Sequence, residues 1–433
     1  MQAKQDLYIC APWMREYNEK GSQGAKEDHV MALHREVDAF AKWVAPTPAE
    51  HRMRREVFDR VKNATAKLWP AAKVELYGSF VTGVCVPMSD MDVVIFDAKG
   101  DTYGPSSATA LHTLAQALVK QKIAIKVEVI STARIPIIKY IDAKTHILVD
   151  VTFECYSAPA NVLLVNSILQ EYPPTRPLAL VIKFYLKLLF LNDKWTGGIG
   201  SFPLLAMVTS YLQHHTKSRG RSSTYTADYN FGSMLLGFFK YWAEEHDYIE
   251  RGVSILESGS YFSKKERGWY NPRAPTLLCI EDPYNPEEDI GCPSFRIDTI
   301  KHCFTVAYTA LSTNDACAVP YDSWLSKLLV VPADVMSHRR WANHNYSNRR
   351  KNKQNNSRKP PRGGNSSLCG RRENRQHSSG GRDSNKSSSN GSRGPQNAGR
   401  KSGNKKSSSP QKGIPVKINS IEEFPALATK TWV

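Results

Sequence analysis

One stretch limits what this chain can fold into more than any other: residues 77–96, YGSFVTGVCVPMSDMDVVIF. It ends in a β-branched and aromatic run, which is typical of a buried strand. Asp90 and Asp92 stand two residues apart where that strand begins, and alternate residues of a strand project from the same face. Two carboxylates held close together in a buried setting repel each other, and a divalent cation relieves the repulsion. The spacing therefore predicts a Mg²⁺ or Mn²⁺ site at the start of the strand.

A Gly78–Ser79 corner lies about ten residues before the acidic pair. Glycine lets the backbone approach a ligand closely, and N–H groups with a hydroxyl at the start of a helix bind phosphate. An isolated Asp-x-Asp is a weak signal, because acidic pairs in loops are usually solvated. The Gly-Ser corner, the spacing and the apolar strand together favour nucleotide chemistry.

A third carboxylate is expected from a neighbouring strand. Residues 146–153, HILVDVTF, have strand character, and Asp150 is the only acidic residue among them. We expect Asp150 to converge with Asp90 and Asp92; the alternative is an edge-strand aspartate that faces water. Asp97 is expected to be structural, because it projects from the opposite side of its strand from Asp92.

Together these motifs resemble the nucleotidyltransferase fold of the DNA polymerase β superfamily. The similarity extends to RIPIIK at 134–139, WTGGIGSF at 195–202, and IEDP at 280–283 with DIG at 289–291. Over roughly residues 12–315 the chain resembles the noncanonical poly(A) polymerases of the TRAMP type, the nuclear enzymes that tag RNA for the exosome. The resemblance implies an α+β protein that has a nucleotidyltransferase sheet domain and a mostly helical central domain.

The expected division into domains follows changes of pattern along the chain. Apolar residues at helical spacing predict a helix within 27–45, and a capping box at 47–50 starts a second helix. Loops are expected at 214–228 and 258–274. The expected units are an N-terminal extension at 1–26 anchored by Trp13, a helix at 27–45 that joins the helical domain, a catalytic domain at 46–165, and the helical domain at 166–338.

Beyond residue 338 the chain becomes rich in Ser, Asn, Gly, Arg and Lys. Residues 339–412 hold 20 Lys and Arg against two acidic residues, so nearly all of the net charge of +17 lies there. This composition predicts a disordered basic tail over 339–412 that binds RNA phosphates without sequence preference. The RNA-binding candidates are Arg349, Arg350, Lys351, Lys353, Arg362 and Arg382.

Other interpretations of this terminal region stay open. Its basic clusters also suit nuclear import, and a merely solubilising tail is the simplest alternative. The last segment, 413–433, contains a small apolar island with the sequence FPAL, which is a candidate docking motif for a partner groove.

The resemblance implies that Asp90, Asp92 and Asp150 are catalytic residues holding two Mg²⁺ or Mn²⁺ ions, with ATP and an RNA 3′ end as substrates. It brings Lys183 and Lys187, one helical turn apart, to the triphosphate; the alternative is that both extend from an apolar helix to water. The implied nucleotide contacts are Gly78 and Ser79 at the phosphates, Asn161 at the ribose, Lys183, Lys187, Ser201, Phe202 stacked on the base, and Glu288 and Asp289 at the adenine amino group.

The residues around 285–291, NPEEDIG, bear on nucleotide choice. Relatives that add uridine commonly carry a His just before the corresponding turn, and its absence here favours ATP. Adenylating relatives often carry Asn-Asp where this chain has Glu288 and Asp289. We therefore expect a template-independent poly(A) polymerase; the alternatives are a terminal uridylyltransferase and a non-catalytic RNA-binding scaffold.

The resemblance also implies partners: a zinc-knuckle RNA-binding protein and an RNA helicase of a TRAMP-like complex, and the nuclear exosome. The implied location is the nucleus, with the nucleolus as one candidate compartment. The eight cysteines show no zinc-ligand spacing, and no apolar stretch reaches the length of a membrane span. We therefore expect an intracellular protein in a reducing compartment, with no membrane partner.

Overall fold

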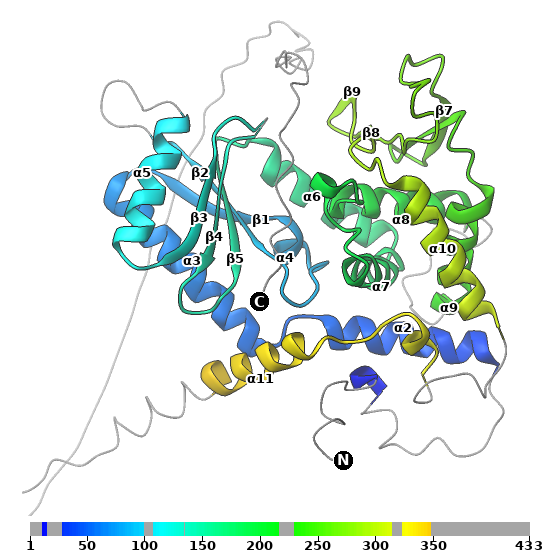
Figure 1. Ribbon diagram of the computed structural model, residues 1–433, viewed down its shortest axis with the longest axis horizontal. Helices are drawn as coiled ribbons and strands as arrows, with labels where there is room; N and C mark the ends of the chain where they lie inside the picture. Colours follow the sequence, from blue (N-terminus) through cyan, green and yellow to red (C-terminus); the bar gives the residue numbers. More distant parts are fainter. Residues whose placement is uncertain are drawn as a thin grey trace, which may run out of the picture. The chain divides into compact units, whose positions relative to one another are not determined.

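The computed structural model describes residues 11–14, 28–98, 107–133, 135–215, 229–313 and 323–347 (Figure 1). Arg134, most of the predicted loop at 214–228 and every predicted RNA-binding residue of the tail lie outside these ranges. So does the FPAL motif. Predictions made for those residues therefore stay predictions.

A five-stranded sheet forms the first part of the fold. Its order is β1-β2-β5-β4-β3, with β2 and β5 parallel and all other neighbours antiparallel. The strands are β1 Lys73–Tyr77, β2 Met91–Phe96, β3 Ala124–Ile130, β4 Ile137–Asp142 and β5 Leu148–Phe153. The strands expected after Asp90 and within 146–153 are therefore present as β2 and β5.

Two helices, α3 Pro48–Leu68 and α5 Ser107–Lys120, cover one face of this sheet (Figure 1). Alternate residues of β2 and β5, such as Val93 and Val149, point into the core beneath these helices. Asp92 and Asp150 stand between such core residues and so project from the opposite face. Because side chains alternate along a strand, the acidic residues face away from α3 and α5.

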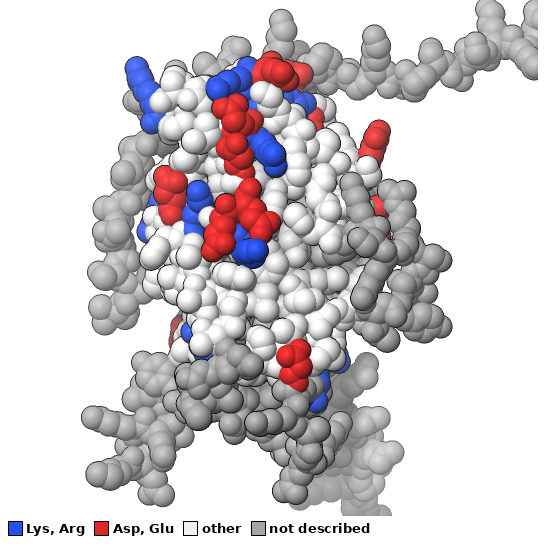
Figure 2. All heavy atoms as spheres, turned by 90° about the vertical axis from the view of Figure 1, so that its right-hand side faces the viewer, with Lys and Arg blue, Asp and Glu red and all other residues white. Residues whose placement is uncertain are grey.

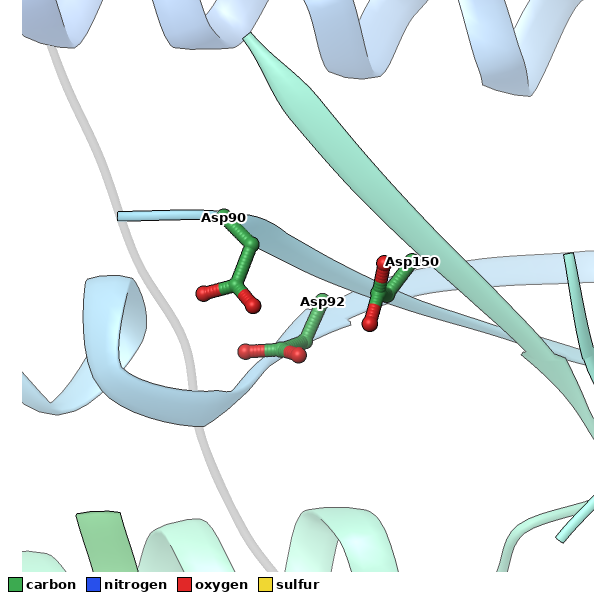
Figure 3. Close-up of side chains that lie close together, drawn as sticks. All are labelled: Asp90, Asp92 and Asp150. Carbon is green, nitrogen blue, oxygen red and sulfur yellow. The ribbon is translucent and has the colours of Figure 1, made fainter. Parts of the chain in front are cut away.

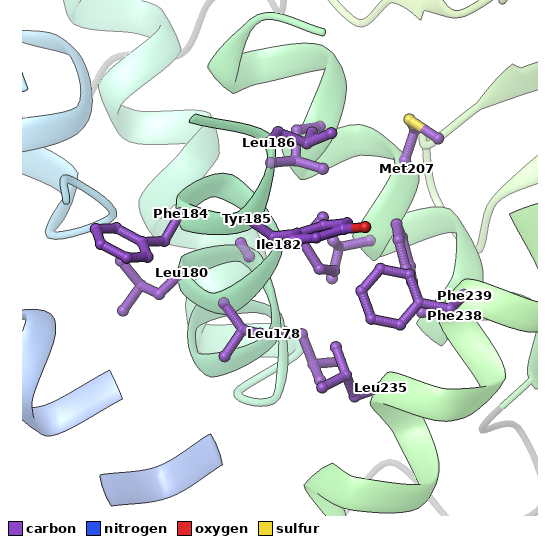
Figure 4. Close-up of a cluster of buried hydrophobic side chains, with 14 of the residues drawn as sticks. Leu178, Leu180, Ile182, Phe184, Tyr185, Leu186, Met207, Leu235, Phe238 and Phe239 are labelled. Carbon is purple, nitrogen blue, oxygen red and sulfur yellow. The ribbon is translucent and has the colours of Figure 1, made fainter. Parts of the chain in front are cut away.

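The second part of the fold is helical, as predicted. Its core is built around α7 Thr175–Leu188, whose Leu178, Ile182 and Leu186 are fully buried among the apolar side chains of Figure 4. The helix at 27–45 is present as α2 His29–Val44 and joins this core, as expected. The other α-helices of this part are α6 Ser157–Glu171, α8 Ser201–His215, α9 Phe231–Lys240 and α10 Ile297–Ser312, and the π-helical turn η5 Tyr241–Glu245 and the 3-10 turns η3 Lys194–Thr196 and η8 Trp324–Lys327 accompany them.

Two short hairpins accompany the helices. β6 Arg251–Ser254 pairs with β7 Ser260–Ser263, and β8 Glu281–Asp282 pairs with β9 Asn285–Asp289. The prediction of a loop over 258–274 was therefore wrong at β7, where the polar composition concealed a strand that is only partly buried.

Two local predictions near the N-terminus are confirmed. The hydroxyl of Thr47 accepts from the N–H of Glu50 at 3.2 Å, and the Glu50 carboxylate accepts from the N–H of Thr47 at 2.7 Å, which is the reciprocal capping box at the start of α3. Trp13, in the short turn η2 Pro12–Met14, is buried and packs edge-on against Phe40 of α2 with ring centroids 5.2 Å apart.

The predicted tail begins too early. Residues 339–347 belong to the helix α11 Ala333–Ser347, whose Ala342 and Tyr346 are buried in the core of the sheet domain. The side chain of Arg339 is also buried, against Glu50 at 3.2 Å, because it pairs there with a carboxylate and with three backbone carbonyls. Composition places Arg339 at the start of the basic tail, but its guanidinium is paired with Glu50 inside the fold.

Charges of both signs lie intermingled on the face that Figure 2 displays, in keeping with a folded part whose charge is nearly balanced. Among the residues that the structure describes, no helix is both long and apolar enough to cross a membrane.

Candidate active site

The three predicted aspartates meet on the face of the sheet opposite α3 and α5. Asp92 of β2 and Asp150 of β5 are direct partners in the parallel ladder, and Asp90 immediately precedes β2. Figure 3 shows the three carboxylates close together, and one oxygen from each lies within 4.8 Å of the others. Three convergent carboxylates form a donor set that fits a hard divalent cation. Asp97, at the far end of the same strand, pairs instead with Lys73.

The position of Gly78 requires glycine, because of its backbone conformation and the nearby Asp92 carboxylate. It begins the short helix α4 Gly78–Thr82 directly after β1, with a φ of +72° that favours glycine. A Cβ atom at this position would lie 1.9 Å from Oδ2 of Asp92. The backbone of the Gly-Ser corner therefore lies against the Asp92 carboxylate, and Ser79 is buried beside it.

Like charges and burial strongly oppose ionisation at this site. Burial, followed by the charges of Asp90 and Asp150, raises the pKa of Asp92 to about 7. Burial also raises the pKa of Asp150, although the neighbouring Lys139 ammonium acts against that shift. A bound divalent cation would remove the repulsion that these shifts express.

Lys139 is a site residue whose side chain sequence reasoning did not assign. It lies on β4 directly opposite Asp150, and its Nζ donates to Oδ2 of Asp150 at 2.8 Å. Burial lowers the pKa of Lys139, but the Asp150 carboxylate outweighs burial and holds the pKa above its usual value. Lys139 is the lysine of the RIPIIK motif, but only the strand register connects it with Asp150.

Four basic side chains end on the loop that leads from α4 to the acidic pair, residues 83–90. Arg54 of α3 donates to the carbonyls of Ser89 at 2.6 Å and Asp90 at 3.3 Å. The other three come from one helix, α7. Arg176 donates to the carbonyl of Gly83, Lys183 to that of Val84 and Lys187 to those of Pro87 and Met88, at 3.0–3.2 Å.

Lys183 and Lys187 thus lie beside the acidic site, and the alternative that they extend into bulk water does not describe them. Burial lowers the pKa of Lys183, and it lowers the pKa of Lys187 to about 8. Both ammonium groups are held by backbone carbonyls of the loop at 83–90, the catalytic loop. Arg54 and Arg176 were not predicted, because contacts across about 35 and 90 residues leave no local pattern in a sequence.

The remaining predicted nucleotide contacts lie on helical-domain elements. Asn161 is on α6, Ser201 and Phe202 form the first turn of α8, and Glu288 is on β9. Phe202 is partly buried against the helical core. The hydroxyl of Tyr284, in the turn between β8 and β9, donates to the carbonyl of Ala160, which joins the Glu288 hairpin to the helix of Asn161.

Asp289 has a structural use that the sequence did not predict. Its Oδ1 accepts from the backbone N–H groups of Ile280, Gly291 and Cys292 at 2.8–3.2 Å. These bonds shape the loop after β9, so this oxygen is already committed to the fold. A contact of Glu288 or of the second Asp289 oxygen with the base stays a prediction.

Comparison with protein families gives two matches along the chain. Residues 33–170 match the central palm domain of the mitochondrial-like poly(A) RNA polymerases, and residues 230–288 match the Cid1 family poly A polymerase domain. The first match contains the acidic trio and the Gly-Ser corner, and the second ends at Glu288.

Curated relatives and a solved structure agree with these matches. Poly(A) RNA polymerase cid14 of Schizosaccharomyces pombe is 31% identical over 79% of this chain and 50% of its own length. Inactive non-canonical poly(A) RNA polymerase protein Trf4-2 of Drosophila melanogaster is 29% identical over 73% of this chain and 77% of its own. The polymerase core of TRAMP, an RNA surveillance complex, superposes with a TM-score of 0.61 at 28% identity, covering 70% of this chain and 91% of that one.

The sheet, its acidic trio and these matches define a nucleotidyltransferase with the DNA polymerase β-like fold. Within that class, the chain is similar to the noncanonical poly(A) polymerases of the TRAMP type, which confirms the predicted resemblance. The chain spans half the length of its Schizosaccharomyces relative.

Proposed function

We propose that the chain is a template-independent RNA adenylyltransferase, which adds adenosines from ATP to RNA 3′ ends. The observation that carries this proposal is the trio of Asp90, Asp92 and Asp150, with carboxylate oxygens within 4.8 Å of one another. One relative of similar sequence is named inactive, so family membership alone does not imply catalysis. An intact acidic trio beside an intact Gly-Ser corner supports catalysis in this chain.

In the proposed reaction the 3′-hydroxyl of the RNA attacks the α-phosphorus of ATP, and pyrophosphate leaves. The three aspartates would hold two divalent cations, Mg²⁺ or Mn²⁺. Such ions, when bound, lower the pKa of the attacking hydroxyl and neutralise charge on the leaving pyrophosphate. The protein itself supplies positioning and charge, which is most of what phosphoryl-type transfer requires.

The chain's own residues divide that work. The backbone N–H groups and the hydroxyl of Gly78–Ser79, at the start of α4, are suited to phosphate oxygens, and the absence of a side chain at Gly78 leaves room for the Asp92 carboxylate beside them. Lys183 and Lys187 already hold carbonyl oxygens of the catalytic loop. We propose that they contact the triphosphate when ATP binds, since phosphate oxygens are stronger acceptors than carbonyls. Asn161, Ser201, Phe202 and Glu288 are proposed to contact the ribose and the base.

The proposed preference for ATP rests on the absence of histidine from residues 285–291. The test is to incubate the chain with a labelled RNA and each nucleoside triphosphate separately, with Mg²⁺ and with Mn²⁺. Extension by ATP far above that by UTP is expected. Clear preference for UTP would overturn the adenylyltransferase assignment in favour of a terminal uridylyltransferase.

The non-catalytic alternative calls for a different test. If the chain acts only as an RNA-binding scaffold, Asp90→Ala should leave its cellular role unchanged. We expect instead that this variant loses that role while it still binds RNA.

We further propose that the chain works in the nucleus, in RNA surveillance and exosome-mediated decay. A relative's solved structure is described as the core of an RNA surveillance complex, which supports this role. The proposed partners are a zinc-knuckle RNA-binding protein and an RNA helicase. Co-purification of tagged chain from nuclear and nucleolar fractions, followed by identification of the bound proteins, tests both statements.

A further inference from the structure

A single row of side chains crosses the sheet at the acidic site. The strand register pairs Tyr77 with Asp92, Asp92 with Asp150, and Asp150 with Lys139. Directly paired residues project from the same face of a sheet. Lys139 is therefore placed at the acidic site by backbone hydrogen bonding, and its position does not depend on a flexible loop.

The contact between Lys139 and Asp150 is well formed. The Nζ–Oδ2 distance is 2.8 Å, and only 12% of the Asp150 side chain is exposed, against 35% for Lys139. Within the described residues, Lys139 is the only hydrogen-bond donor to the Asp150 carboxylate. The equivalent pair at the other end of the sheet, Lys73 with Asp97, is longer at 3.2 Å and is more than half exposed on both sides.

A carboxylate on a short side chain rotates freely about its last bond unless a partner fixes it, because that torsion has broad energy wells. Asp150 has to keep one orientation if its oxygens are to converge with those of Asp90 and Asp92. Groups that hydrogen-bond to ligands of a metal commonly supply this constraint. Lys139 is the group in the described structure that can do so for Asp150.

We propose that Lys139 is a positioning residue, whose hydrogen bond to Oδ2 fixes the Asp150 carboxylate in the orientation that completes the acidic trio. The inference rests on the proposed metal-dependent transfer. Positioning by Lys139 and the charge of Lys139 have opposite effects on cation binding. An ammonium group next to a cation site repels the cation, so removal of its charge should by itself tighten cation binding. Loss of positioning should weaken it.

Two substitutions separate these effects. Lys139→Met and Lys139→Gln both remove the charge, but only glutamine keeps an N–H donor. Mn²⁺ binding is measured by electron paramagnetic resonance and calorimetry, and the sites that persist in Asp92→Asn are subtracted. We expect Lys139→Met to bind Mn²⁺ about 10-fold to 100-fold more weakly than wild type. Lys139→Gln and Lys139→Arg should lie closer to wild type.

Kinetics provide a second readout with ATP and RNA. The kcat of Lys139→Met should fall by about the same factor, while the KM values for ATP and RNA stay within about twofold of wild type. Lys73→Met is the matched control, because it breaks a lysine–aspartate pair of the same sheet away from the trio. Thermal unfolding of each variant shows whether the fold is retained.

Three outcomes would overturn the inference. Mn²⁺ binding by Lys139→Met as tight as wild type or tighter would show that only charge matters. Equal losses of Mn²⁺ affinity in Lys139→Met and Lys139→Gln would show that the hydrogen bond to Asp150 does not position the carboxylate. A raised KM for RNA with unchanged kcat would make Lys139 a substrate contact. If wild type itself binds no Mn²⁺ at the trio, the proposed function falls as well, and the wild-type titration alone reveals that case.

Discussion

At the scale of single residues, the surroundings of Asp92 strongly oppose its negative charge. Its pKa is raised to about 7 by burial and by two neighbouring carboxylates, against about 4 for an aspartate in an unfolded chain. Between these values the folded state binds the proton more tightly than the unfolded state does. Without metal, Asp92 therefore lowers the stability of the fold as the pH rises from about 4 through about 7.

Because ionised Asp92 destabilises the metal-free fold, Asp92→Asn should stabilise it in the presence of a chelator. At pH 8 the variant should be more stable than wild type by about 1–3 kcal/mol, because the amide carries no charge. At pH 4.5 the difference should be several times smaller, and it should vanish below the unfolded-state pKa of about 4. Thermal unfolding at both pH values measures it, with Asp97→Asn as the control from the exposed end of the same strand. A difference independent of pH would contradict the prediction.

Gly78 supports a second prediction at this scale. In Gly78→Ala the new methyl group would overlap the Asp92 carboxylate, so transfer should fall by about 100-fold or more and Mn²⁺ binding should weaken. Gly268→Ala is a matched control, since Gly268 has nearly the same φ, +73°, and no atom lies within 4 Å of its added Cβ. It should keep full transfer. Equal effects in the two variants would show that only backbone strain matters.

The site was partly predictable for a physical reason. Asp90 and Asp92 lie within a few residues of the Gly-Ser corner, and period-two alternation reports their common face. Lys139, Arg54 and Arg176 meet the site only through strand register and helix packing. Asp289 has a further use that the sequence did not indicate, because its Oδ1 accepts from the backbone N–H groups of Ile280, Gly291 and Cys292, which the sequence pattern does not report.

At the scale of elements, α11 differs most from what the sequence predicted. Val335, Arg339, Ala342 and Tyr346 are buried and recur at helical spacing, but composition conceals that face. The buried Arg339 guanidinium bonds the carbonyls of Trp43, Val44 and Ala45 at the end of α2. It also pairs with Glu50, the residue that caps α3. Long-range pairing of this kind cannot be inferred from local pattern.

A pair of truncations tests this element. A chain ending at His338 should be less stable than one ending at Ser347 by at least about 3 kcal/mol, because Glu50 loses its buried partner and the core loses Ala342 and Tyr346. Denaturant unfolding of both chains measures the difference. Arg339→Met in the longer chain should show part of the loss. Equal midpoints for the two truncated chains would refute a structural role for the end of α11.

At the scale of the whole molecule, the uneven distribution of charge indicates that the basic tail, and not the folded part, supplies most of the RNA affinity. The folded part is nearly neutral, and the basic excess lies beyond residue 338. Deletion of 348–412, which spares α11, should weaken RNA binding and flatten its salt dependence, by about 0.7 in log–log slope for each RNA phosphate that the tail no longer neutralises. Addition of a single nucleotide should stay nearly intact. RNA affinity of the shortened chain equal to that of the full chain would contradict the prediction.

The central claim is that three converging aspartates make this chain an adenylate-transferring enzyme. The most direct test is extension of a labelled RNA by ATP and Mn²⁺, with wild type, Asp92→Asn and Asp97→Asn compared side by side. We predict extension by wild type and by Asp97→Asn, and a loss of at least about 1000-fold in Asp92→Asn. Extension by Asp92→Asn at the wild-type rate, or none by wild type, would contradict the claim.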